Sequence, residues 1–577
     1  MSKLTVDDKS IIDLFGDKKT YFLIPDYQRP YAWGDEECQT LWDDIFAFAF
    51  PGEDKDAFNS DDEYFLGPIV TYKNDNNQLE VIDGQQRLTT IMLLLRAFYA
   101  RYKNQQDQQS KSTKEQIQKC IWKTDEFGKP DMDSLKIDSE VATDDDKNEL
   151  ISILKTGVVD KDSKSVYARN YRFFEAKIQD FLDNYSGYFS YLPIRILNNC
   201  ILLPIEAESQ ETALRIISTL NDRGKPLSDS DIFKAKLYKF YKDLDKKDEF
   251  IKSWKDLEKV CDEVFKKSTG RPIDEIFTRY MYYHRALNGN KSTTTEALRK
   301  FYDVNSGLLN SEQTMEDLLS LANFWKDVEI QEQTKFTEPV LKKLSILRNA
   351  PNSMWTYFVS VYYMTNKDKD GYLDNDSFFE FLNLSISFIF TYAVTNPGVN
   401  SLRNPIFSEM LNVVQKKPVT FSDYKFDGTK LMSQLNNFSF NNSKPITRSM
   451  VTWWAYENEN QELLSANTPF DIEHIYARKR HQISKLNDSK NLDVLGNKSL
   501  LERRINIRAS DYRFEDKKKY YLGFKTENGQ VKEGTAICEL VEITNNADFT
   551  EDDIIDRNKL ILESFVNYVR SNNLIDE

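Results

Sequence analysis

Two stretches in the last quarter of the chain read Asp471-Ile472-Glu473-His474-Ile475 and Leu495-Gly496-Asn497-Lys498-Ser499-Leu500-Leu501. The first stretch is strand-like. Because side chains alternate between the two faces of a strand, we expect Asp471 and Glu473 to point one way and His474 the other. Asn506 follows in a predicted helix. An acid–His strand, a turn that carries Asn497 and a helix therefore occur in this order.

These residue types suit the hydrolysis of a phosphodiester. The reaction needs a nucleophilic water, which a neutral imidazole can supply, and a leaving alkoxide whose charge one Mg²⁺ can neutralise. The order of elements resembles the ββα-metal, or HNH, nuclease fold, although the last histidine of the motif's name is absent. We expect His474 to be the general base, and Asn497 to brace the turn and orient it.

The remaining C-terminal assignments follow from the same chemistry. The predicted metal ligands are Glu473 and Asn506, with Asp471 as a further candidate. The predicted DNA-binding residues are Lys498, Arg503, Arg504 and Arg508, which suit phosphate oxygens. Between His474 and Lys519 there are 13 Lys and Arg against 6 Asp and Glu, a local charge of +7 in a chain with a net charge of −15. This reversal of sign indicates a phosphate-facing surface.

Structural interpretations compete with these roles. A lone histidine is more often a satisfied core or surface residue, and we assign that role to His284 and His481. Lys517–Lys519 is interpreted as a solvated helix face. An aromatic group near the N-terminus (Tyr27, Tyr31, Trp33, Trp42) is a candidate for stacking on a modified base, but a core role is favoured.

Two N-terminal blocks, 24–33 and 81–90, form a second constellation. The second block contains Asp83-Gly84-Gln85-Gln86-Arg87, a predicted strand–turn–helix joint. Such a joint presents backbone N–H groups at the positive end of a helix dipole, where anions bind. The predicted nucleotide-binding residues here are Arg29, Asp83, Gly84, Gln85, Gln86 and Arg87. Taken alone, Gly-x-x-Arg is a weak motif, because ordinary strand–turn–helix joints also contain it.

Together, the blocks resemble GmrSD-type modification-dependent (Type IV) restriction endonucleases. A third block, from Glu211 through 220–228 to Asp231 and Lys234, is similar to the N-terminal domain of that family, which is related to the ParB/sulfiredoxin superfamily. It adds Asn221, Arg223 and Asp231 to the predicted nucleotide-binding residues, although a helix C-cap and surface loop would also explain its Asn-Asp-Arg-Gly sequence. The family often has Pro two residues after the His-Ile pair, where this chain has Ala477.

The resemblance implies a nucleotide-regulated, Mg²⁺-dependent DNA endonuclease with NTPase activity that cleaves modified phage DNA, for example glucosylated hydroxymethylcytosine, in anti-phage defence. Its partners would be DNA, a nucleoside triphosphate and a second copy of the chain. Two alternatives remain: a nickase linked to phosphorothioate marks, and a ParB-like nucleotide switch whose C-terminal domain only binds DNA. Metal-dependent cleavage would exclude the switch.

Composition and patterning set the frame for these sites. The patterning of the 577 residues predicts an α+β, predominantly helical protein with a helical middle at 241–430. The resemblance implies a ParB/sulfiredoxin-like domain at 1–240 and a ββα-metal (HNH) domain at 431–577. Five scattered cysteines, no C-x-x-C pair, no signal peptide and no apolar run of about 20 residues favour a cytoplasmic protein without a membrane span.

Individual elements are also predicted. A hairpin is expected at 65–72 and 79–82, with helices at 88–102, 167–182 and 213–220. A solvated helix end or loop is expected at 103–119, a strand-rich stretch at 194–205 and a boundary region at 416–445. Residues 378–394 are interpreted as a buried helix.

Overall fold

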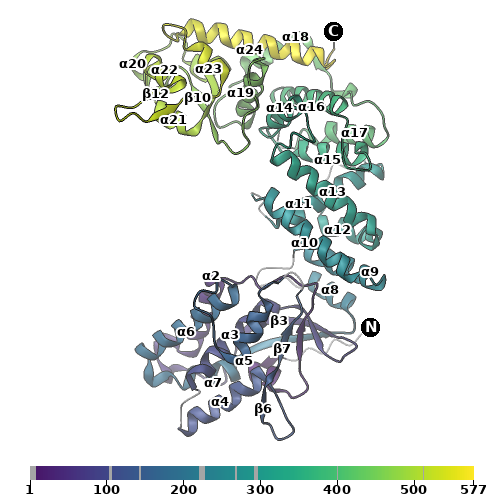
Figure 1. The fold of residues 1–577 in the computed structure, drawn as a ribbon, viewed down its shortest axis with the longest axis vertical. Coiled ribbons are helices and arrows are strands. Elements are labelled where there is room, and N and C mark those ends of the chain that lie inside the picture. The colour runs from purple at the N-terminus through teal and green to yellow at the C-terminus, as the bar shows by residue number, and fades with distance from the viewer. Residues whose placement is uncertain are drawn as a thin grey trace. The chain divides into compact units, whose positions relative to one another are not determined.

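The computed structural model describes residues 8–102, 107–141, 144–219, 228–266, 270–290, 297–398, 400–510 and 512–576. The chain divides into two compact units, Met1–Lys255 and Asp256–Glu577. Helices dominate both units, and the sheets are small (Figure 1). The predicted α+β, mostly helical class is therefore confirmed. The division into three domains stays a prediction.

The first unit is built on a mixed six-stranded sheet with the strand order β1-β8-β3-β4-β2-β7. Its strands are β1 (Lys9–Ser10), β2 (Phe22–Ile24), β3 (Tyr64–Lys73), β4 (Leu79–Asp83), β7 (Ile137–Ser139) and β8 (Cys200–Ala207). β3 and β4 form the predicted antiparallel hairpin, with Thr71 opposite Val81. β8 runs parallel to β3, and β2 runs parallel to β4. A separate two-stranded sheet joins β5 (Trp122–Thr124) and β6 (Pro130–Leu135).

Helices pack around this sheet. They are α1 (Ile11–Gly16), α2 (Asp35–Ala49), α3 (Gln85–Tyr102), α4 (Gln108–Ile121), α5 (Lys147–Thr156), α6 (Val166–Asn184), α7 (Tyr191–Asn199), α8 (Gln210–Thr219) and α9 (Asp229–Asp243), followed by α10 (Lys247–Val264), which crosses into the second unit. α3 is buried along almost its whole length, which explains its run of apolar residues. Tyr27, Tyr31 and Trp42 are buried, as the core interpretation requires.

Two predictions of local structure are wrong. The polar segment before residue 120 is a helix, α4, because Ile117, Cys120 and Ile121 make one apolar stripe that packs into the core. The stretch from 194 onward begins as helix α7 and turns into strand β8 only at Cys200. Both segments are short, and the tertiary contacts of their apolar residues outweigh local composition.

The second unit begins with a run of helices, as the sequence predicts. They are α11 (Pro272–Leu287), α12 (Leu298–Val304), α13 (Glu312–Glu329), α14 (Glu338–Leu347), α15 (Met354–Asn366), α16 (Asn375–Thr395) and α17 (Arg403–Val414). Within the described residues, only α16 is long and apolar enough to span a membrane by length and composition. About 61% of its apolar window is buried within the protein, in agreement with the predicted core helix.

The remainder of the unit is smaller in scale. Its elements are β9 (Phe426–Asp427), α18 (Gly428–Asn437), α19 (Pro445–Glu457), β10 (Phe470–His474), α20 (Arg478–Ile483), β11 (Lys498–Glu502), α21 (Arg503–Ala509), α22 (Phe514–Leu522), β12 (Gly523–Lys525), β13 (Val531–Glu533), α23 (Cys538–Ile543), α24 (Glu551–Ser571) and β14 (Ile575–Asp576). The predicted boundary region at 416–445 thus contains helix α18. β10 and β11 pair antiparallel, and α21 follows β11 directly.

Candidate functional site

His474 is the last residue of β10, opposite Lys498 at the start of β11. Its side chain is about 9% exposed, and its Nε2 has no hydrogen-bond partner within the described part of the chain. The nearest anionic group is Asp493 Oδ1, 3.6 Å from Nε2, which is too long for a good hydrogen bond. The imidazole therefore faces a carboxylate, and its Nε2 makes no hydrogen bond to the described protein.

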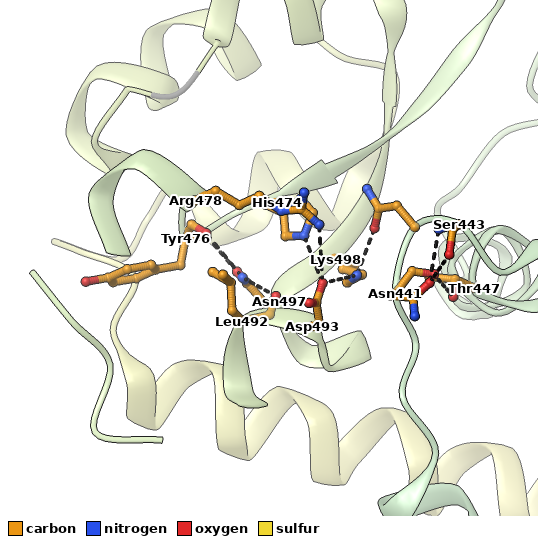
Figure 2. Close-up of polar contacts among 11 residues, drawn as sticks. Asn441, Ser443, Thr447, His474, Tyr476, Arg478, Leu492, Asp493, Asn497 and Lys498 are labelled. Atoms are coloured by element: carbon orange, nitrogen blue, oxygen red, sulfur yellow. Dashed lines mark hydrogen bonds and ion pairs between the residues drawn. The ribbon is translucent and has the colours of Figure 1, made fainter. Parts of the chain in front are cut away.

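The Asp493 carboxylate lies within 4 Å of the basic side chains of His474, Arg478 and Lys498 (Figure 2). Its Oδ1 accepts from Lys498 Nζ at 3.0 Å and lies 3.5 Å from Arg478 Nη2. Lys498 Nζ also donates to Asn442 Oδ1 at 2.8 Å. The sequence predictions missed Asp493. Its position in the short turn just before Leu495-Gly496-Asn497 is the signal that could have indicated it.

The electrostatics of this cluster keep His474 neutral. Burial, together with the charges of Lys498 and Arg478, lowers the pKa of His474 to about 4. Burial alone would raise the pKa of Asp493, but the hydrogen bond and charge of Lys498 outweigh it and hold that pKa below its usual range. At neutral pH the site thus combines a neutral imidazole with a carboxylate anion.

Asn497 organises the chain around His474. Its Oδ1 accepts from Tyr476 N at 2.7 Å, and its Nδ2 donates to Tyr476 O at 3.2 Å and to Leu492 O at 3.0 Å. It is completely buried. These bonds tie the segment that follows His474 to the turn that carries Asp493, which is the geometry of a brace.

Helix α24 fixes the same turn from the other side. A Cβ on Gly496 would lie 2.1 Å from Ile554 O, so only glycine allows this close approach. Arg557 Nη1 donates to the carbonyl oxygens of Leu495, Gly496 and Lys498, each at 2.9 Å. The Leu-Gly-Asn sequence is therefore a docking point for α24.

Glu473 lies in a different environment from His474. Its Oε1 accepts from Lys517 Nζ and from Tyr521 Oη, both at 2.6 Å, and Lys517 also donates to His474 O at 2.7 Å. Glu473 and Lys517 are about 4% and 1% exposed. The interpretation of Lys517 as part of a solvated face is wrong, because β10 turns Glu473 inward against α22, where the buried carboxylate needs a cation.

Asp471 and Asn506 form a third group. Asp471 accepts from Arg503 Nε at 3.1 Å and from Asn506 Nδ2 at 3.4 Å. The structure thus brings Asp471 to Asn506, but the side chains of Glu473, His474 and Asn506 have different partners. The proposed roles of Glu473, Asn506 and Asp471 as metal ligands stay predictions.

The predicted DNA-binding residues differ in accessibility. Arg503 and Arg504 are exposed, and Arg508 donates to Glu533 O at 3.1 Å. The side chain of Lys498 is fully buried. A direct phosphate contact by Lys498 is therefore a prediction that needs correction: β11 points it inward, where it holds Asp493.

The donor set at His474 limits the kind of metal site it can form. Within the described residues, no cluster of three or more His, Cys, Asp or Glu side chains could hold an ion. Mg²⁺ often uses only one or two carboxylates and completes its shell with waters and phosphate oxygens. The Asp493 side chain is about 39% exposed and lies next to Nε2 of His474, but its Oδ1 already pairs with Lys498 and lies 3.5 Å from Arg478, so it would offer such a hydrated ion one carboxylate shared with two cations.

The N-terminal blocks meet as the sequence predicts. Gly84 has φ +92° between β4 and α3, so the turn needs glycine. Gln86 Oε1 accepts from the backbone N of Ala32 and Trp33, at 2.7 and 3.2 Å, and its Nε2 donates to Pro30 O at 3.1 Å. Both the oxygen and the nitrogen of the Gln86 amide thus bond to the backbone of the first block. The role of Gln86 here is structural, and its amide nitrogen is already committed rather than available to a phosphate.

The other predicted nucleotide-binding residues line the same joint or lie apart from it. Gln85 Nε2 donates to Arg29 O at 3.3 Å, and its buried Oε1 has no partner in the described structure. Arg87 Nη1 donates to Pro68 O at 2.8 Å. Asp83 ends β4, and Asp231 forms a capping box with Ser228 at the start of α9. Asn221 and Arg223 lie outside the described residues.

Comparison with known proteins gives two matches to family models. Residues 11–238 match the GmrSD restriction endonuclease, N-terminal domain. Residues 427–564 match the GmrSD restriction endonucleases, C-terminal domain, and include the whole His474 cluster. The two matches together cover more than half of the chain. No curated protein matches it.

Proposed function

The chain belongs to the GmrSD restriction endonuclease family, and from this we propose that it is a nucleotide-regulated, metal-dependent endonuclease that cleaves modified DNA in anti-phage defence. Restriction endonucleases of this family act on DNA. The finer assignments, which include Type IV specificity, an HNH-type site, Mg²⁺, a glucosylated substrate, NTPase activity, a cytoplasmic location and a second copy of the chain as a partner, are part of the proposal.

The observation that carries the proposal is the uncommitted His474 Nε2 beside Asp493. His284 Nε2 is also buried without a described hydrogen-bond partner, so the feature that distinguishes His474 is the Asp493 carboxylate 3.6 Å from its Nε2. A neutral imidazole beside a carboxylate, at a strand end braced by Asn497, suits a general base. The order β10, β11, α21 also supports a ββα-metal (HNH) domain, and the Gly84 turn in a mixed sheet supports a ParB/sulfiredoxin-like domain.

In the proposed reaction His474 Nε2 accepts a proton from a water that attacks the phosphorus. A divalent cation on Asp493 would neutralise the leaving alkoxide. Lys498 and Arg478 keep the Asp493 carboxylate ionised and in place, while Asn497 holds the backbone of the turn. The exposed Arg503 and Arg504 hold flanking phosphates.

The pKa of about 4 makes His474 a weak base in the protein alone. A DNA phosphate next to the imidazole would favour the imidazolium and raise this pKa, whereas a divalent cation on Asp493 would oppose that shift. The strength of the base in the complex would therefore depend on the charges of the phosphate and the cation together.

The test is a set of digestions of unmodified, hydroxymethylated, glucosylated and phosphorothioated DNA, each with and without Mg²⁺ and each NTP. We expect Mg²⁺-dependent cutting of a modified DNA that increases with NTP. His474→Ala should lower the rate by about 10²–10⁴-fold while NTP binding remains. The control His481→Ala removes a partly buried histidine of α20 whose Nδ1 accepts from Leu486 N, and it should cut normally.

Other results would replace the proposal. Full activity of His474→Ala would remove the assigned base. Cutting of phosphorothioated DNA alone would indicate the nickase alternative, and DNA binding without cleavage under every metal would indicate the ParB-like switch.

A further inference from the structure

A cavity lies in the helical part of the second unit and is lined by none of the residues assigned above. Its volume is about 830 Å³, within the range of ligand sites. It is lined by the end of α15, the first half of α16, the loop that follows α17 and the last residues of α24. Asn383 Nδ2 donates to Asn572 Oδ1 at 3.2 Å and joins α16 to the end of α24 there.

The charge of this cavity is positive in an acidic protein. Lys416, Lys417 and Lys425 line it, against one carboxylate, Glu380. Lys416 Nζ is fixed by Thr365 O and Asn366 Oδ1, at 2.6 and 3.0 Å. Within the described structure, the exposed Lys417 and Lys425 have no side-chain hydrogen bond or ion pair. Two uncommitted ammonium groups on one wall favour an anionic ligand.

One aromatic ring offers a flat surface in the same cavity. Tyr362 is partly exposed and stacks on Phe381, which lines the same cavity, with ring centroids 4.0 Å apart at an interplanar angle of 22°. A ring supported in this way is a platform on which a base can stack. Asn573, Thr420 and Ser422 add hydrogen-bonding groups around it.

A buried carboxylate fixes the loop that carries the lysines. Lys416 and Asn573 have φ values of +56° and +55° because each follows a helix cap, where a left-handed residue ends α17 and α24. Within the loop, Phe421 has φ +49°. Buried Glu409 accepts from the backbone N of Phe421 at 2.6 Å and of Thr420 at 3.3 Å, and so holds the loop in place.

We propose that this cavity binds a nucleotide unit, with the base on Tyr362 and the phosphate on Lys417 and Lys425. The unit can come from a DNA strand or from a free nucleoside triphosphate. The inference rests on the proposed function only in taking nucleic acid or nucleotide as the ligand. It assigns a role in recognition to the helical middle, separate from cutting at His474.

The charge test uses the full-length double variant Lys417→Glu/Lys425→Glu and a fluorescein-labelled DNA single strand in EDTA, where cutting cannot occur. We expect about tenfold weaker binding and a smaller salt dependence, with a slope of log K against log salt reduced by about 0.7 for one phosphate. The control Lys252→Glu/Lys259→Glu makes the same change of net charge at two exposed α10 lysines that do not line the cavity.

The stacking test uses Tyr362→Leu, with thermal unfolding to confirm that it folds. Loss of one stacked base should weaken binding by roughly tenfold. For the free-nucleotide source, 8-azido-ATP is photocrosslinked and the labelled peptides are mapped. Label at 354–366 or 416–425 that disappears in the lysine variant indicates a free nucleotide, and an effect on the DNA strand alone indicates DNA.

The proposal is overturned if the lysine variant binds the DNA strand as tightly as the α10 control does and no label maps to the cavity. Because binding is measured without cleavage, this result would not contradict the proposed nuclease activity. Conversely, loss or retention of cutting in His474→Ala would not test the cavity.

Discussion

Asp493 is the residue whose role depends most on distant neighbours. Replacing it with Asn keeps the size of the side chain and leaves an oxygen to accept from Lys498, but it removes the counter-charge of this buried ammonium, so some loss of stability is expected and thermal unfolding is measured to confirm folding at the assay temperature. The anionic oxygen beside His474 is lost, however. We expect cleavage to fall at least about 100-fold, measured as nicking of plasmid DNA.

The control for this change is Asp556→Asn, an exposed acid on α24. It removes the same charge away from the site and should cut at the normal rate. Normal nicking by Asp493→Asn would remove Asp493 from the proposed site.

For Glu473 we expect a substitution to affect stability more than cleavage. Its only described partners are Lys517 and Tyr521, all three buried, so Glu473→Gln leaves a buried ammonium without its counter-charge. We expect a loss of about 3–5 kcal/mol in the free energy of unfolding, measured by urea denaturation. The double variant Glu473→Gln/Lys517→Met should recover much of this loss. A stable Glu473→Gln protein with no metal-dependent cutting would instead support the original assignment of Glu473 as a metal ligand.

At the scale of elements, adding one methyl group to the Leu495–Asn497 turn should weaken its contact with α24 and lower the stability of the protein. Gly496→Ala places a Cβ against Ile554 O and Asn558 and forces the helix away from the turn. We expect about 1–3 kcal/mol of destabilisation, or more if the turn cannot shift. Gly307→Ala, where a Cβ meets nothing within 4 Å, is the control and should change stability by a few tenths of a kcal/mol. Equal stability of the two variants would contradict the docking role of the turn.

Elements with a strong local signal were predictable. The strand at β10, the hairpin β3–β4, the Gly84 turn and the helices α3, α6 and α16 follow from apolar patterning and turn chemistry. α4 was missed because its apolar residues occupy one narrow stripe within a Gln- and Lys-rich sequence. Only the core that covers this stripe shows that it is a helix with a buried face.

At the scale of the whole molecule, the chain divides into two compact units, and a large apolar core lies within the first. We expect scanning calorimetry to resolve two unfolding transitions. Phe98→Leu, in the core of the first unit, should lower the temperature of one transition, and Gly496→Ala should lower that of the other. A single transition that both variants shift equally would show that the two units unfold as one.

By itself, the sequence determined the class of the fold, the strand with His474, the bracing Asn497 in its turn and the strand–turn–helix joint at Gly84, because these depend on residues close together in the chain. The tertiary structure alone decided that His474 faces Asp493, that Glu473 pairs with Lys517 and that Lys498 is buried. Each of these pairings is set by which faces meet when β10, β11, α22 and α24 pack, and a buried charge takes the nearest counter-charge that packing provides.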